Sequence, residues 1–150
     1  MRYIIFSIKF TNFRPKVKKL LINHYQSFFT QLFMDANEIL DYCLAQKGVT
    51  ETFPFDKETL VMKVGAKMFL LMSLDKQPLT IAVKTDPEWS AELREQHPQI
   101  TGAYHMNKTH WNSVSLDGLK KELIIKLIDH SYDLVFKSLT KKIQNIIINS

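Results

Sequence analysis

The sequence predicts an α+β fold: a two-layer sandwich in which helices pack on an antiparallel sheet. Short apolar runs separated by brief connections predict antiparallel strands. Two well-marked helix starts, at Asp35 and Asp86, and a long apolar stripe near the C-terminus predict the helices. The expected order is helix, three strands, helix, two strands, helix.

Composition indicates one globular domain without a disulfide framework. The chain has 150 residues, of which 45% are hydrophobic and 23% charged. A single cysteine, Cys43, excludes an internal disulfide and fits a reducing cytoplasmic location. The apolar run at residues 3–6 is far shorter than the roughly 20 residues that span a bilayer. We therefore expect no membrane span and no signal peptide.

The positive charge belongs to the N-terminal segment. The formal charge is +5, yet residues 1–33 hold six basic and no acidic residues, which leaves 14 basic against 15 acidic residues in 34–150. Because residues 1–33 lack a sustained period and contain Pro15, we predict an extension outside a folded domain that starts at Met34. The alternative is a basic arm for phosphates or a membrane surface.

The first helix has a capping box, since Asp35 is followed three residues later by Glu38. Gly48 suits its C-terminal cap. Residues at helical spacing form one apolar face, which places Cys43 in the core; they are Ile39, Leu40, Cys43 and Leu44.

Three strands follow an extended segment at residues 53–55, where Pro54 disfavours helix. Residues 60–64 and 68–72 predict a hairpin with a type II′ turn at Gly65 and Ala66. The strand 68–72 is apolar on both faces, so we expect helices on one side and a partner, terminal segment or second subunit on the other. Residues 79–83 alternate as a strand with one buried face.

The second half contains a helix, a hairpin and a final helix. Asp86, Pro87 and Glu88 mark a helix that ends before His97. A hairpin is expected over 104–114, with its turn at 107–109, followed by a turn at 116–118. One long helix then runs from Leu119, with an apolar stripe formed by Leu123, Ile124, Leu127, Ile128, Leu134, Val135 and Leu139.

Candidate catalytic and metal groups are weak. His105 and His110 flank the 107–109 turn, but two histidines are fewer ligands than zinc sites use. Residues 129–131 are Asp, His and Ser, yet adjacent helical positions do not face one another, and His130 is better placed to pair with Asp133. The four glycines are too scattered to cradle a phosphate. We predict no catalytic residue, metal or cofactor.

Lysines recur near the predicted turns. Lys63 and Lys67 bracket one turn, Lys76 lies in the next connection, Lys84 ends the third strand and Lys108 sits in the 107–109 turn. Cations on hairpin tips suit DNA-contacting wings. The alternative is that edge lysines protect the sheet from aggregation.

Several sequence blocks together resemble the MmcQ/YjbR family of small bacterial proteins over residues 34–140. The most specific block is Tyr-His-Met-Asn-Lys-x-His-Trp-Asn at 104–112. The others are residues 41–45, 48–51, 53–55, 59–64, 67–69, 84–88 and 129–135.

The resemblance implies a compact fold related to the CyaY or secretion-chaperone arrangement, without catalytic residues. It also implies DNA binding through two hairpin wings. The positions implicated are Lys108, His110 and Trp111, and more loosely Lys63, Lys67 and Lys84. Thr85 and Ala66 depart from the family pattern without touching this prediction.

The sequence thus predicts a cytoplasmic, non-enzymatic DNA-binding domain over 34–150, with salt-sensitive affinity and no membrane partner. The alternative is a protein-interaction or chaperone-like module that uses the apolar strand 68–72 as a docking or dimer face.

Overall fold

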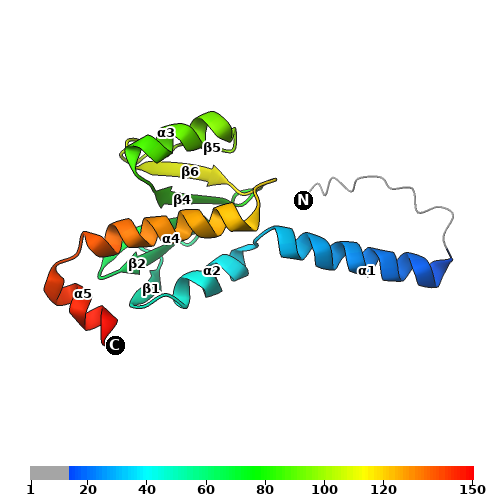
Figure 1. The fold of residues 1–150 in the computed structure, drawn as a ribbon, viewed down its shortest axis with the longest axis horizontal. Helices are drawn as coiled ribbons and strands as arrows, with labels where there is room; N and C mark the ends of the chain where they lie inside the picture. Colours follow the sequence, from blue (N-terminus) through cyan, green and yellow to red (C-terminus); the bar gives the residue numbers. More distant parts are fainter. Residues whose placement is uncertain (1–13) are drawn as a thin grey trace.

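The computed structural model describes residues 14–150, which form one six-stranded antiparallel sheet and five helices (Figure 1). The strand order is β1-β2-β3-β4-β6-β5. The strands are β1 (Val49–Thr52), β2 (Thr59–Val64), β3 (Lys67–Ser73), β4 (Thr80–Lys84), β5 (Ile100–Gly102) and β6 (Trp111–Ser115). The helices are α1 (Pro15–Leu32), α2 (Ala36–Leu44), α3 (Pro87–Gln96), α4 (Lys121–Lys137) and α5 (Lys141–Ile148).

One face of the sheet carries the helices and the core. In β2, Leu60, Met62 and Val64 point to this helix-bearing face and belong to the buried core cluster. The core residues of β3, β4, β5 and β6 lie on the same face, and α2, α3, α4 and α5 supply most of the rest. Four more core residues come from the connecting segments: Met34, Leu116, Leu119 and Leu139. Figure 1 shows α4 crossing in front of the strands with α2 beside it.

The alternate strand residues form the second face, which contributes nothing to that core cluster. Its members follow from the strand register. They are Thr50 and Thr52 of β1; Thr59, Val61 and Lys63 of β2; Met68, Leu71 and Ser73 of β3; Thr80, Ala82 and Lys84 of β4; Thr101 of β5; and Trp111, Ser113 and Ser115 of β6.

A β-bulge aligns β3 with the core. The register shifts opposite Met62 and Lys63, so Phe69 and Leu70 both lie buried on the helix-bearing face. Ser131 of α4 bridges β3 and β4 beyond their last paired residues: its hydroxyl donates to the Phe69 carbonyl and accepts from the Lys84 N–H at 2.8 Å. The hydroxyl thereby satisfies two backbone groups that the ladder leaves open.

The predicted fold class and helix starts are confirmed. Asp35 and Glu38 form the reciprocal capping box, with backbone-to-side-chain distances of 2.9 and 3.0 Å. Pro87 begins α3 and the helix ends before His97, although Asp86 makes no capping hydrogen bond. Cys43 is fully buried, as predicted.

Several predicted boundaries are wrong. Residues 15–32 form α1, which projects away from the sheet (Figure 1), where no regular element was expected. β1 was not predicted, since only an extended segment at 53–55 was expected before β2. The helix α2 ends at Leu44, so Gly48 lies in a later turn instead of capping the helix. Whether residues 1–33 lie outside the folded domain stays a prediction.

Turn geometry also differs from expectation. Gly65 and Ala66 both have positive φ, 53° and 65°, which is the pattern of a type I′ turn and not II′. The 104–114 hairpin begins earlier, with β5, so Tyr104 lies in the connecting loop. The single long last helix is two helices, because the chain turns after Lys137 and Thr140 caps α5. No helix among the described residues is long and apolar enough to cross a membrane.

Candidate nucleic-acid interface

The six predicted DNA-contacting residues lie in three separate places. Lys63, Lys84 and Trp111 belong to the second face of the sheet. Lys108 and His110 lie in the loop between β5 and β6, residues 103–110, which we call the β5–β6 loop. The third place is the helix side of the molecule, where Lys67 sits.

Lys63 and Lys84 share one row of the second face. Lys63 pairs with Met68, and Lys84 pairs with Trp111. Because β2 and β4 are two strand spacings apart, the two lysines are separated by roughly 10 Å. The Lys84 ammonium lies 5.3 Å from the Trp111 ring centroid, and Trp111 is only 6% exposed. Trp111 therefore supports Lys84 by a cation–π contact and offers almost no surface of its own.

The second face carries hydroxyls and ammonium groups but no carboxylate. Glu51 is the single acidic residue in the six described strands, and its pairing with Met62 places it on the helix-bearing side. Eight hydroxyl side chains lie on this face: Thr50, Thr52, Thr59, Ser73, Thr80, Thr101, Ser113 and Ser115. Two of them are already engaged, since Thr59 donates to Asp56 Oδ2 at 2.9 Å and Thr80 to the Pro78 carbonyl at 3.2 Å. Such a face can donate hydrogen bonds to anionic oxygens without repelling them.

Arg94 holds the β5–β6 loop. Its Nη2 donates to the Lys108 carbonyl at 2.6 Å and to the Trp111 carbonyl at 3.3 Å, and its Nε donates to Asn112 Oδ1 at 2.8 Å. Asn107 closes the turn as predicted, since its carbonyl accepts from the N–H groups of His110 and Trp111. The loop is therefore fixed at both ends, although it lies outside the strands.

Asn112 connects the loop to α3. This residue is fully buried, and its amide donates to Thr85 Oγ1 at 2.8 Å and to Ser90 Oγ at 3.2 Å. Its carbonyl oxygen is the acceptor for Arg94. The amide thus ties β6, the end of β4 and the first turn of α3 together.

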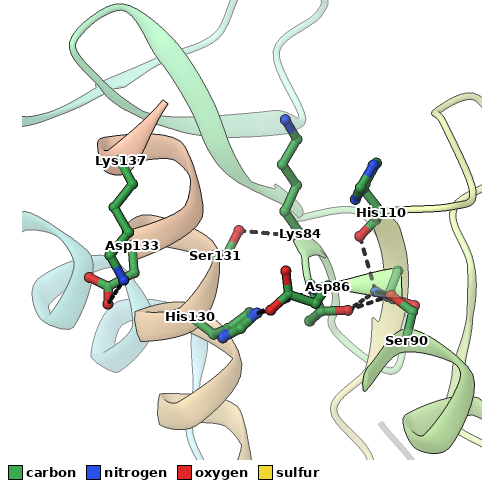
Figure 2. Close-up of polar contacts among 10 residues, drawn as sticks. Lys84, Asp86, Ser90, His110, His130, Ser131, Asp133 and Lys137 are labelled. Atoms are coloured by element: carbon green, nitrogen blue, oxygen red, sulfur yellow. Dashed lines mark hydrogen bonds and ion pairs between the residues drawn. The ribbon is translucent and has the colours of Figure 1, made fainter. Parts of the chain in front are cut away.

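Lys84 and His110 lie on neighbouring segments. The His110 carbonyl accepts from the Thr85 N–H at 2.9 Å, and Figure 2 shows the Lys84 and His110 side chains extending in the same direction. Lys108 lies elsewhere on the loop: its stem covers Gly102, where an added Cβ would be 3.3 Å from the Lys108 Cβ. Gly102 faces the helix-bearing side, so the Lys108 stem and Lys84 lie on different sides of the hairpin.

Lys67 has a structural partner. Its ammonium donates to the Ser138 carbonyl at 3.0 Å and to the Ser138 hydroxyl at 3.1 Å. Ser138 is the C-cap of α4, where a cation satisfies terminal carbonyls and opposes the helix dipole. This position removes Lys67 from the surface that holds Lys63 and Lys84.

The Asp-His-Ser segment forms no relay. Asp129 accepts from the Tyr42 hydroxyl at 2.9 Å and from Gln46 Nε2 at 2.8 Å. The His130 Nε2 lies 3.1 Å from the Asp86 carboxylate (Figure 2).

The partner expected for His130 was wrong. Asp133 pairs with Lys137 at 3.3 Å, and Asp86 takes its place beside His130. The Asp86 N–H also lies 3.3 Å from His130 Nε2. One ring nitrogen cannot donate and accept at once, and the shorter carboxylate contact favours donation.

Burial fixes the protonation of two groups near Asp129. Burial, followed by the hydrogen bond to Asp129, raises the pKa of Tyr42 to about 12. Burial, with a smaller effect of the Asp129 charge, raises the pKa of the Cys43 thiol to about 12. Both groups are neutral near pH 7, so Cys43 is a core side chain and no thiolate nucleophile.

Neither the predicted histidine pair nor a cavity supplies another site in the described part of the chain. The His105 ring packs edge-on against Tyr104, with centroids 4.5 Å apart. Residues 14–150 contain no group of three or more His, Cys, Asp or Glu side chains that could hold a metal ion. A shallow cavity of about 500 Å³ lies between α4 and α5 and is lined by Asp129, Tyr132, Phe136 and Ile147 among others; it includes none of the predicted DNA-contacting residues.

Sequence reasoning missed Arg94 and Asn112 as the residues that hold the loop. Asn112 stood inside the most specific sequence block, so that block did contain the signal. Arg94 lies in the last turn of α3, 14 residues from Lys108, and nothing local to the helix indicates that contact.

Comparison with known proteins places this geometry in a family. The YjbR family model matches residues 44–134. YjbR of Escherichia coli K12, described as an uncharacterized protein, is 30% identical over 116 residues, which cover 77% of this chain and 98% of that protein. YbdF of Escherichia coli O157:H7, also described as uncharacterized, is 38% identical over 93 residues, covering 61% of this chain and 76% of YbdF.

Two crystal structures have similar folds. Deinococcus radiodurans protein DR2400, with a DUF419 domain, superposes with a TM-score of 0.73 at 40% identity, covering 77% of this chain and 88% of that one. A Pseudomonas syringae protein superposes with a TM-score of 0.59 at 29% identity, covering 68% of this chain and 99% of that one. The matched segment, which includes the β5–β6 loop and its Asn112 anchor, shows that the chain belongs to the YjbR family.

Proposed function

We propose that this chain binds DNA without catalysing a reaction on it. The contacts are made by Lys63 and Lys84 on the second face and by Lys108 and His110 of the β5–β6 loop. The observation that carries the proposal is the second face itself, where two lysines share a row and the described strands place no carboxylate. Such a surface favours polyanion binding because each contact between a lysine and a phosphate releases counterions.

Charge segregation supports the proposal more than net charge does. Residues 34–150 carry one more acidic than basic residue, so the domain as a whole does not attract a polyanion. Apart from Glu51, the carboxylates lie in helices and loops, and the one nearest to Lys84 in the chain, Asp86, is paired with His130 at 3.1 Å. Lys16 and Lys19 are exposed on α1 and Arg14 is exposed just before it, and all three add positive charge outside the sheet.

Of the two hairpin tips expected to contact DNA, the β5–β6 loop is exposed, whereas the tip of the β2–β3 hairpin is packed against other residues. The tip of the β2–β3 hairpin packs against the C-terminal helices, because a Cβ added at Gly65 would lie 2.6 Å from Leu139. Lys67 beside this tip is bonded to Ser138. The β5–β6 loop is instead exposed at Lys108 and His110 while Arg94 holds its backbone.

The test is a salt titration of DNA affinity with charge-matched variants of the full chain. Fluorescence anisotropy on a labelled duplex would compare wild type with Lys63→Gln/Lys84→Gln and with Lys137→Gln/Lys142→Gln. Each pair removes two charges, but the second pair lies on α4 and α5. Two lost phosphate contacts reduce the slope of log K against log salt by about 1.8, and lower the affinity.

The outcomes are distinct. The proposal expects the Lys63/Lys84 variant to lose affinity and slope while the α4/α5 variant behaves as wild type. Equal losses of affinity in both variants would show that net charge, and not the second face, determines DNA binding. Absence of wild-type binding at low salt would overturn the proposal.

A second candidate function is favoured by the apolar centre of the second face. Met68 and Leu71 are half-buried there, next to Ala82, and neither belongs to the core cluster. Residues 68–72 have apolar side chains on both faces, which supports this second candidate. Sedimentation measured over a range of concentrations tests the dimer form of this idea: self-association that Leu71→Thr abolishes supports it, and a constant monomer mass excludes it.

A further inference from the structure

The β5–β6 loop presents an aromatic ring to solvent. Tyr104 is 79% exposed, the highest value among the exposed large hydrophobic side chains of the described chain. Trp111, which directly follows the loop, is instead buried beneath Lys84. Leaving a tyrosine ring in water forgoes the stabilisation that burial would give, so its exposure invites a ligand with a flat apolar surface.

Two further groups define the chemistry of that ligand. The Lys108 ammonium lies 5.6 Å from the Tyr104 ring centroid, and the His105 ring meets the Tyr104 ring edge-on at 4.5 Å and 78°. Despite these two contacts Tyr104 is 79% exposed, so most of its surface stays open to a ligand. A planar aromatic ligand next to a negative charge matches this pair of aromatic surface and cation, and a nucleotide has both features.

The loop backbone is held before any ligand arrives. Arg94 fixes the Lys108 carbonyl at 2.6 Å, and the Lys108 stem packs on Gly102. Asn107 Oδ1 accepts from the Thr109 N–H at 3.0 Å and stiffens the turn. Ring and cation are thus presented on a backbone that needs little ordering, which favours binding.

Resting on the DNA-binding function proposed above, we propose that Tyr104 stacks on an unpaired base while Lys108 contacts the adjoining phosphate, so that the site prefers single-stranded DNA to intact duplex. In a duplex each base already stacks on its neighbours and offers its edges, not its faces, to the protein. An exposed ring gains a stacking partner only where the strand is unpaired. Removing the ring should therefore weaken binding to an unpaired strand more than binding to a duplex.

The experiment measures the anisotropy of the full chain with labelled oligothymidylate and with a labelled duplex of equal length. Tyr104→Ala removes the ring, Tyr104→Phe keeps it, and Phe55→Ala removes another exposed aromatic, 62% exposed, from a different loop. Tyr104→Ala should weaken binding to the single strand by about tenfold and leave duplex affinity within about twofold. Tyr104→Phe and Phe55→Ala should match wild type.

Stacking and DNA binding fail separately in this design. If both DNAs bind and Lys63→Gln/Lys84→Gln weakens them, but Tyr104→Ala weakens neither or weakens both equally, the stacking inference is overturned while DNA binding stands. If wild type binds neither DNA at low salt, the proposed function fails as well. Because Tyr104 is so exposed, Tyr104→Ala should unfold at the wild-type urea midpoint, and a lower midpoint would overturn the inference by assigning the ring to the fold.

Discussion

The two faces of the sheet are built from alternate residues of the same strands, yet their side chains have different chemistry. The helix-bearing face presents Leu, Ile, Val and Met to the helices, while the second face presents Thr, Ser and Lys around a small apolar centre. The helix-bearing face therefore supplies most of the buried core, while Val61 and Trp111 are the buried apolar residues of the second face. The period of two residues along a strand is enough to separate the two roles.

The two hairpins repeat this division. The β2–β3 tip packs on Leu139 and Ile143, and Lys67 beside it caps α4. The β5–β6 loop is longer, exposed at its tip and held from below by Arg94. Turns rich in lysine look alike in sequence, but only a tip without packed neighbours can meet a ligand.

The largest expected difference between the faces is in the free energy of unfolding. Leu70 is fully buried on the helix-bearing face, and Leu71 is half-buried on the second face. We expect Leu70→Ala to lower the free energy of unfolding by about 2–5 kcal/mol, and Leu71→Ala by roughly 1 kcal/mol. Urea denaturation measures both, and equal losses would contradict the division of roles.

Polar residues should show the same contrast at a smaller scale. Asn112→Ala leaves Arg94 and the Thr85 and Ser90 hydroxyls without their amide partner, which should lower the free energy of unfolding by about 2 kcal/mol. Ser113→Ala, one residue along and on the second face, should change it by less than about 0.5 kcal/mol. A neutral Asn112→Ala would refute the anchoring role of the amide.

Alkaline pH should weaken the helix-bearing side through Tyr42. Its pKa rises from 10.0 to about 12 on folding, so the contribution of its neutral hydroxyl is complete below pH 10 and is lost as the pH rises from 10 to about 12. In Tyr42→Phe the fall in stability over this range should be smaller. Some fall remains, because burial of Cys43 and Tyr132 raises their pKa values too. Urea midpoints of wild type and Tyr42→Phe measured as a function of pH test this prediction. Parallel curves for the two proteins would contradict the role of Tyr42.

The smallest expected effects are those of single substitutions at Lys67 and Lys84, which lie on opposite faces of the sheet. Lys67→Gln should lower the free energy of unfolding by about 0.3–1 kcal/mol, because α4 loses a C-terminal cation, and should leave DNA affinity unchanged. Lys84→Gln should weaken DNA binding and reduce its salt slope by about 0.9. A larger affinity loss for Lys67→Gln than for Lys84→Gln would reverse the assignment of the two residues.

Much of the fold could be read from local pattern. The Asp35–Glu38 capping box, the Asp86-Pro87 helix start and the alternation that marks β4 are signals carried by a few adjacent residues. The elements that were predicted wrongly have short or conflicting sequence patterns. β1 has four residues with a single large apolar one, and the apolar stripe of α4 continues to Leu139 although the chain turns after Lys137.

Only those contacts of the candidate site that follow from strand register could be predicted from the sequence. Once β4 and β6 are placed, their pairing puts Lys84 beside Trp111. The contact of Lys67 with Ser138 spans 71 residues, and that of Arg94 with Lys108 joins a helix to a loop. Both depend on tertiary packing, so no local pattern distinguishes a lysine that binds a ligand from one that caps a helix.

Lysine footprinting would test the proposed binding role of the second face and the β5–β6 loop most directly. Amine acylation of the full chain, read out by mass spectrometry with and without DNA, measures which ammonium groups DNA covers. We expect protection at Lys63, Lys84 and Lys108, and none at Lys137 or Lys142 on the helices. Protection confined to the helices, or none at all in saturated complexes, would contradict the assignment of binding to this face.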